Sequence, residues 1–502
     1  DVKRQVKNHI RWSGNNEISL QEAQMRTFSN FAWMFLQTEG DYNFSSGSRG
    51  RGNLSSTANP YFLFPQIYNF RYNIYSSEWP VANRAIELYL QKKSENEGWE
   101  RQINGLSNNE KANLLLEKHT FKELLADVEQ RNLQNNIVGL EASRLFARSE
   151  INMGVDAFRD SLYAMLKRNT FLNIKFENML DTLGEMSRTD LYSYLKEWEQ
   201  LTPLPFYSIG EPELTKVVNK GGEEFFVLKV LVSNNSDYDG IIQMNVLQNG
   251  WWYQPMEDPR ARKKVEIAAH TSKEFVSVWE EQIRDVEINT MVSGNLPYMI
   301  RQSIGNVKQE RNKIVKDTIY TLPESSLEMP GEVIVDNEDS TLFVLSTPAV
   351  VGLLPKWLDK VEDTSFKYSG ISWWRAPLQW TATTNAKYYG KYIRSAYVIK
   401  SGDGSQTATW KIPVPEAGQY ELYYHVFKDD ELRWNDRLQG EYHFRVAYDS
   451  EMEDAYINLR KANEGWEQLG TYYFSADTVR VVLTDECKLR SVTADAVKIV
   501  KR

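Results

Sequence analysis

Cysteine is nearly absent from this chain of 502 residues, because Cys487 is the only one. A single cysteine excludes an intrachain disulfide, which fits a reducing compartment and also an exported bacterial protein that never used disulfides. The chain also lacks any apolar run near the roughly 18 residues that a membrane-spanning helix needs. Its net charge of −9 excludes the basic overall character typical of proteins that bind nucleic acid.

Sequence motifs for catalysis are missing as well. None of the five histidines stands in the H-E-x-x-H pattern, which places two zinc ligands on one helical face. No G-x-S-x-G nucleophile motif occurs either. We therefore assign no catalytic residue and expect no cofactor other than a metal discussed below. His425 and His443 lie on expected strands, opposite the core-facing residues, and could meet across a sheet; ordinary surface histidines are the favoured interpretation.

The length of the chain predicts several domains, and the first is expected to be helical. Residues 1–203 carry apolar side chains at helical spacing, for example Phe158, Leu162 and Leu166. Ser107 followed by Glu110 forms a capping box, in which each side chain satisfies a free backbone amide at the start of a helix. These patterns predict an α-helical domain over 1–203.

After Pro203 and Pro205 the apolar period changes from 3.6 to 2, which is typical of strands. Alternating segments predict a β-sandwich over 204–305, and a charged and Pro/Ser-containing stretch predicts a linker over 306–331. Further strand-turn-strand units predict a second β-sandwich over 332–502. The predicted fold class is therefore multidomain α + β, with an N-terminal α-helical domain followed by two antiparallel β-sandwich domains.

Clustered carboxylates suggest one metal site. The segment VDNED at 335–339 holds Asp336 and Asp339, and Asp495 approaches them if the first and last strands of the final sandwich pair. Oxygen-rich clusters of this kind suit Ca²⁺, so calcium is the one metal that we expect here. The alternative, which we favour, is a turn, because Asp-Asn-Glu-Asp is also good turn chemistry.

Tryptophan is abundant, with 15 in the chain, and seven of them lie in the final domain. Indole rings in exposed loops stack on sugar faces or clamp peptides, because they are flat and apolar and carry one donor. Trp373, Trp374 and Trp434 lie in irregular sequence and are the candidate ligand-binding residues. Trp410, within ATWKI, is expected in the core; packing also remains an alternative for the other three.

Residues 333–500 contain stretches that resemble a known family. The final domain resembles the golvesin C-terminal-like, or xanthan-lyase-associated, domain on these segments: VIVDNEDSTLF (333–343), YYGKYIRSA (388–396), ATWKIPVPEAGQYELYYHV (408–426), WEQLGTYYF (466–474) and TADAVKIV (493–500). The resemblance implies a β-sandwich attached to exported bacterial enzymes and surface proteins, with a binding or adhesive role. It implies no catalytic residues.

A second resemblance covers 153–300. The stretches MGVDAFRDSLYAMLKRNTFLNIKFENMLDTLGEMSRTDLYSYLKEWEQLTPLPFYSIG (153–210), NNSDYDGIIQMNV (234–246) and SGNLPYMI (293–300) resemble the region downstream of the zinc site in gluzincin (membrane alanyl) aminopeptidases. The zinc motif of that family is missing from this chain. Because the sequence begins at Asp1, we expect either that an export segment was removed or, as favoured, that this is a piece of a longer protein.

The leading functional hypothesis is a noncatalytic scaffold and binding region of an exported bacterial protein, located in the periplasm, on the outer-membrane surface or outside the cell. Its expected partner is a glycan or a protein, bound through the C-terminal β-sandwich. The alternative is an enzyme: the C-terminal region of a zinc aminopeptidase-like metallopeptidase, whose catalytic half lies upstream or is lost.

Overall fold

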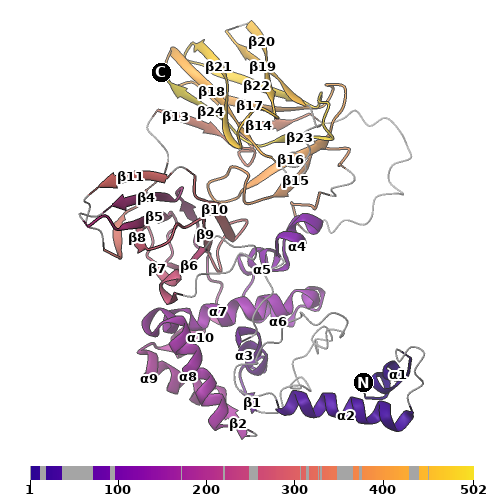
Figure 1. Cartoon of the computed structure of the whole chain (residues 1–502). Helices are drawn as coiled ribbons and strands as arrows, with labels where there is room; N and C mark the ends of the chain where they lie inside the picture. Colours follow the sequence, from indigo (N-terminus) through magenta and orange to yellow (C-terminus); the bar gives the residue numbers. More distant parts are fainter. Residues whose placement is uncertain are drawn as a thin grey trace. The chain divides into compact units, whose positions relative to one another are not determined.

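The chain is mixed α/β, with most of its strands in several antiparallel sheets (Figure 1). The computed structural model describes residues 2–11, 19–36, 72–90, 97–170, 172–218, 221–247, 258–305, 307–311, 316–325, 327, 331–346, 366–371, 376–428, 440–449 and 451–502. It contains two compact units, Asp1–Glu95 with Phe121–Gln200, and Asn96–Thr120 with Leu201–Arg502. No helix among the described residues is long and apolar enough to cross a membrane.

The first unit is largely helical. Its elements are α1 (Val2–Arg11), α2 (Leu20–Leu36), α3 (Ala82–Leu90), α6 (Phe121–Ala126), η2 (Glu129–Asn132), α7 (Gln134–Met153), α8 (Val155–Arg168), α9 (Phe176–Ser187), α10 (Leu191–Lys196), η3 (Glu197–Glu199) and the parallel strands β1 (Tyr72–Tyr75) and β2 (Leu172–Lys175). The apolar stripe expected on α8 is buried, with Phe158, Leu162 and Leu166 almost inaccessible. Buried Trp198 packs against Trp79 and Phe121, with ring centroids 5.2 and 4.7 Å away.

Helices α4 (Glu97–Asn104) and α5 (Asn108–Leu116) group with the second unit rather than with the other helices. The predicted capping box is confirmed at the start of α5. Ser107 Oγ accepts from the Glu110 N–H at 3.2 Å, and a Glu110 carboxylate oxygen accepts from the Ser107 N–H at 2.7 Å. Between the two helices, Gly105 has a φ of +80°, and a Cβ there would lie 2.3 Å from the Ser369 backbone. Only glycine fits this close approach between the end of α4 and the Ser369 backbone.

Two sheets built from residues 207–323 share one apolar core. One contains β3 (Tyr207–Ile209), β4 (Glu213–Val218), β5 (Glu224–Asn234), β8 (Thr271–Trp279), β11 (Val307–Arg311) and β12 (Thr318–Pro323); the other contains β6 (Gly240–Leu247), β7 (Arg262–Ile267), β9 (Asp285–Asn289) and β10 (Met299–Ser303), with η4 (Pro259–Ala261) before β7. Val230, Ile242 and Trp279 are among the residues buried between them. Side chains of both sheets therefore exclude water from a common interior.

Strands β11 and β12 correct the linker predicted over 306–331. The first pairs in parallel with β4, and the second pairs antiparallel with β8. Val307 and Ile319 pack against the core of these sheets, which gives each strand one apolar anchor. Three of the charged residues that suggested a linker, Lys308, Glu310 and Arg311, instead lie on β11 at one edge of the sheet, where water reaches them.

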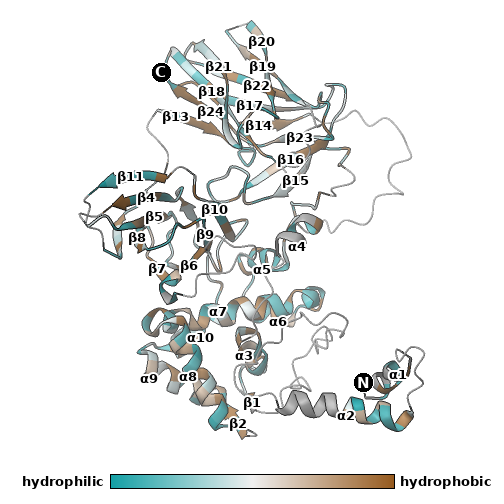
Figure 2. Ribbon diagram, in the orientation of Figure 1, coloured by the Kyte–Doolittle hydropathy of each residue, from teal (hydrophilic) through white to brown (hydrophobic). Residues whose placement is uncertain are grey.

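Residues 332–501 form a second set of sheets around their own core. The order of the first sheet is β13 (Glu332–Val335), β24 (Val497–Lys501), β18 (Gly418–Val426) and β21 (Gly465–Phe474); that of the second is β14 (Phe343–Leu345), β17 (Thr407–Pro413), β22 (Thr478–Thr484), β19 (Glu441–Tyr448) and β20 (Glu451–Asn458); that of the third is β15 (Thr381–Thr384), β16 (Ser395–Lys400) and β23 (Ser491–Ala494). Figure 2 shows hydrophobic and hydrophilic residues mixed along these strands.

The alternation along these strands places one row of side chains inside. Trp410, Tyr424 and Phe444 come from three strands of two sheets and are fully buried in one cluster. Trp410 thus lies in the core, as expected. The first and last strands of this region do pair, because β13 is antiparallel to β24 and hydrogen-bonded to it.

Candidate functional site

A buried carboxylate orients one imidazole on the outer face of the sheet β13–β24–β18–β21. Because Tyr424 and Val426 point into the core, His425 between them points outward. Its Nδ1 lies 2.8 Å from Oδ2 of Asp495, which is fully buried between β23 and β24. The Tyr389 backbone N–H also donates to this carboxylate at 3.2 Å. Asp495 therefore accepts from a ring and from a backbone amide that are far apart in sequence.

Burial dominates the electrostatics of Asp495. Desolvation raises the pKa of Asp495, while His425, the Tyr389 amide and the Arg394 guanidinium act in the opposite direction. Burial also lowers the pKa of Arg394 to about 10. When Nδ1 of a neutral imidazole donates to a carboxylate, Nε2 carries the free lone pair. Among the described residues, no hydrogen bond occupies His425 Nε2, so this atom is available as an acceptor.

Two aromatic rings flank His425. Trp466 stands opposite His425 in the register of β18 and β21, and their ring centroids are 5.1 Å apart at 78°. The ring centroid of Tyr389 lies 5.0 Å from that of Trp466 and 5.8 Å from that of His425. We call Tyr389, His425, Trp466 and Asp495 the His425 site. It combines two partly exposed aromatic rings with one oriented hydrogen-bonding nitrogen.

Lys498 borders the His425 site on the neighbouring strand β24. Its Nζ lies 4.9 Å from the Trp466 ring centroid and 5.4 Å from that of Tyr423. The same Nζ forms an ion pair with Glu332 at 2.9 Å. Lys498 therefore supports the aromatic rings from one side, and its charge is already compensated.

Two of the expected calcium ligands, Asp336 and Asp339, lie in one turn, whereas Asp495 contacts His425. The Asp339 N–H donates to the Asp336 carbonyl at 3.2 Å, and Asp339 Oδ1 accepts from the N–H and hydroxyl of Thr341 at 3.0 and 2.6 Å. These bonds lower the pKa of Asp339. Burial, together with the nearby charge of Asp495, raises the pKa of Asp336 well above its usual range. Asp336 and Asp495 thus repel each other, whereas Asp339 serves the turn.

No geometric support for a metal comes from this part of the molecule. Within the described residues, no group of three or more His, Cys, Asp or Glu side chains could hold a metal ion. Calcium at Asp336, Asp339 and Asp495 remains an expectation from the sequence.

The two strand histidines do not meet. His425 lies on β18 and His443 on β19, which belong to different sheets. His443 instead contacts Asp454 and Glu486 at 2.8 and 3.3 Å, and stacks on Tyr456 at 4.9 Å. The hypothesis of a histidine pair across one sheet is therefore wrong, since alternation fixes the face of a residue but not its sheet.

The predicted tryptophan platform cannot be placed. Trp373, Trp374 and Trp434 lie outside the described residues. Sequence reasoning missed Trp466 and Tyr389 as binding candidates. The available signal was the aromatic run at 388–392 together with a tryptophan on a strand, which pointed as readily to packing as to a ligand.

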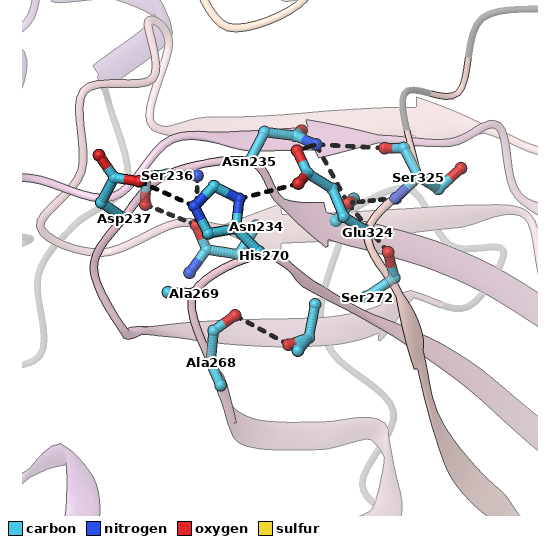
Figure 3. Close-up of polar contacts among 12 residues, drawn as sticks. Asn234, Asn235, Ser236, Asp237, Ala268, Ala269, His270, Ser272, Glu324 and Ser325 are labelled. Carbon is cyan, nitrogen blue, oxygen red and sulfur yellow. Dashed lines mark hydrogen bonds and ion pairs between the residues drawn. The ribbon is translucent and has the colours of Figure 1, made fainter.

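A second histidine with two carboxylates occurs in the sheets of 207–323. His270 Nε2 lies 2.8 Å from Asp237, and its Nδ1 lies 2.8 Å from Glu324 (Figure 3). Asn235 donates to the other oxygen of Glu324 at 2.8 Å. The two carboxylates raise the pKa of His270, with Asp237 contributing most. These residues join the turn after β5, the turn before β8 and the end of β12, and Asp237, His270 and Glu324 are exposed to solvent.

Comparison with known proteins bears on the C-terminal sheets. Residues 374–501 match the Golvesin C-terminal domain. This match confirms the golvesin-like resemblance over most of the final sheets, including the His425 site. It does not touch 153–300, so nothing bears on the aminopeptidase-like resemblance. No curated protein matches the chain.

Similarities to solved structures are weak. A Podospora anserina GH26-CBM35 β-(1,4)-mannanase is 11% identical over 35% of this chain and 28% of its own, with a TM-score of 0.19. A Bacteroides uniformis β-glucuronidase is 11% identical over 62% and 31%, with a TM-score of 0.17. The chain thus spans less than a third of either enzyme, and at these scores neither similarity carries an argument.

Proposed function

We propose that residues 332–502 form a noncatalytic, glycan-binding β-sandwich of an exported bacterial protein. Residues 1–203 would be its helical domain, 204–323 a first sandwich, and both would act as a scaffold. The match of 374–501 to the Golvesin C-terminal domain supports a binding or scaffold role, and is consistent with a secreted or surface-exposed protein. The periplasm, the outer-membrane surface and the extracellular space are all compatible with this proposal.

The observation that carries the glycan proposal is the chemistry of the His425 site. A sugar presents an apolar face of C–H groups and an edge of hydroxyl groups. Trp466 and Tyr389 offer aromatic surface for the face, and His425 Nε2 offers an acceptor for a hydroxyl. Asp495 holds the imidazole, so the acceptor needs little reorganisation on binding.

A glycan array on the full chain, followed by calorimetry on each hit, tests this proposal. Trp466→Ala should weaken binding about tenfold or more, because one stacked aromatic ring contributes on the order of 1 kcal/mol beyond the area it buries. Tyr473→Ala is the matched control, since Tyr473 is 61% exposed on the same strand β21 but away from His425. Equal effects of both variants, or no hit on the array, would contradict the proposal.

Trp373, Trp374 and Trp434 remain proposed contributors, and their replacement by Ala belongs in the same measurement. If these variants lose glycan binding while Trp466→Ala keeps it, the binding site lies at Trp373, Trp374 and Trp434 and not at the His425 site. No observation favours the second candidate function, an aminopeptidase-like enzyme. A peptidase assay on the purified chain, with and without added zinc, tests this alternative. Hydrolysis rates equal to that of a protein-free reaction in both conditions would rule it out.

A further inference from the structure

Helix α1 concentrates positive charge in an otherwise acidic chain. Residues 2–11 contain Lys3, Arg4, Lys7 and Arg11 and no acidic residue, which gives this helix a charge of +4. The rest of the chain therefore carries −13, since −9 − 4 = −13. Lys3 and Lys7 are exposed. A basic helix on an acidic protein directs one local surface toward an anionic partner.

Helix α2, which packs with α1, exposes large apolar side chains. Leu20, Met25 and Phe28 are 58%, 61% and 69% exposed. At 3.6 residues per turn these three positions fall within an arc of about 140°. Ala23 and Thr27, which are buried, lie outside that arc. Over residues 20–28, the exposed apolar side chains therefore lie away from the buried side chains of α2.

These two features together match an interfacial helix pair. Helices that lie in a bilayer surface combine lysine and arginine with large apolar residues such as Leu and Phe. The lysines attract anionic headgroups, and the apolar side chains insert at the acyl boundary. An acidic protein partner would explain the positive charge of α1. It would not explain the three widely exposed apolar side chains on the adjacent helix α2.

We propose that the α1–α2 hairpin, Val2–Arg11 with Leu20–Leu36, binds the surface of an anionic phospholipid bilayer. Lys3 and Lys7 would contact phosphate headgroups, while Leu20, Met25 and Phe28 would enter the outer acyl region. The bilayer would hold this unit peripherally. This inference is independent of glycan binding, because it involves neither the His425 site nor its sheets.

Vesicle co-sedimentation of the full chain tests the inference. Vesicles of phosphatidylcholine mixed with phosphatidylglycerol should bind the protein, and vesicles of phosphatidylcholine alone should bind far less. Each lysine near an anionic surface contributes about fivefold in affinity, so Lys3→Gln with Lys7→Gln should lower binding on the order of tenfold or more. Raised salt should weaken binding in the same direction.

Matched variants separate the contributions. Lys118→Gln with Lys263→Gln removes the same charge from two other exposed lysines and should leave binding unchanged. Phe28→Ser should weaken binding to anionic vesicles without changing the circular dichroism spectrum, because its ring is exposed. Equal loss from both lysine pairs, or no preference for phosphatidylglycerol, would overturn the proposal. Tight binding to soluble polyglutamate that Phe28→Ser leaves intact would also overturn it, in favour of an acidic protein partner.

Discussion

Two histidines in this chain make the same contact in opposite surroundings. His425 lies 2.8 Å from Asp495, and His270 lies 2.8 Å from Asp237. The side chains of the first pair are 13% and 0% exposed, whereas those of the second are 53% and 81% exposed. Water competes for the second contact and is nearly excluded from the first. Distance alone therefore does not tell which pair holds the structure together.

The two surroundings also differ in what each histidine leaves open. His270 uses both ring nitrogens, one for Asp237 and one for Glu324 (Figure 3). His425 uses only Nδ1 in the described part of the chain, and its ring contacts those of Tyr389 and Trp466. His270 thus links two exposed carboxylates at the surface, whereas His425 keeps one ring nitrogen open for the proposed ligand.

The largest effect should come from Asp495→Ala. This change leaves the Tyr389 N–H and the His425 N–H without the fully buried carboxylate that accepts from them, which should cost about 3 kcal/mol. Hydrogen-exchange mass spectrometry should show faster exchange in peptides from β18 and β24. Asp237→Ala is the control at the exposed pair and should leave exchange in β5 and β8 nearly unchanged. Comparable losses at both sites would remove the distinction between them.

A smaller effect should follow from Asp336→Asn. Burial and the charge of Asp495 raise the pKa of Asp336 above its ordinary 3.8. Between the two values the folded chain keeps a proton that the unfolded chain has lost, so stability falls as pH rises through that range. The Asn variant should flatten part of this fall, measured as the melting temperature of the C-terminal transition from about pH 4 upward. An unchanged slope would mean that Asp336 ionises normally.

The smallest effect should come from His270→Asn. Asp237 and Glu324 raise the pKa of His270 above its ordinary 6.5, so its contribution is present below that pH and is lost as pH rises through the folded value. Because the group is open to solvent, the change in melting temperature should be close to measurement error, and high salt should abolish it. A clear drop in melting temperature at acidic pH that persists in high salt would instead show that the His270 contacts stabilise the fold.

Local patterns in the sequence predicted the local structure well. The Ser107–Glu110 capping box needs only four neighbouring residues, and alternation along 408–426 placed Trp410 inside. Strands β11 and β12 were missed because an edge strand needs few apolar residues. Val307 and Ile319 each anchor their strand, while polar neighbours such as Lys308 face water. Charge in such a strand therefore resembles charge in a linker.

The candidate site was only partly predictable. Outward-facing His425 and core Trp410 follow from alternation, but the burial of the imidazole does not. It depends on Tyr389 and Trp466, which come from a loop before β16 and from the partner strand β21. The sequence placed His443 on the same kind of face without indicating that β19 belongs to another sheet. Long-range pairing decides both features, and no local pattern records it.

The pairing of β13 with β24 brings the first and last residues of the C-terminal sheets side by side. Glu332, at the start of β13, lies opposite Val500, near the end of β24. A short peptide could join these two ends, and the chain could be opened instead at the exposed turn 415–417 between β17 and β18. Such a circular permutant would keep every strand pair of the region.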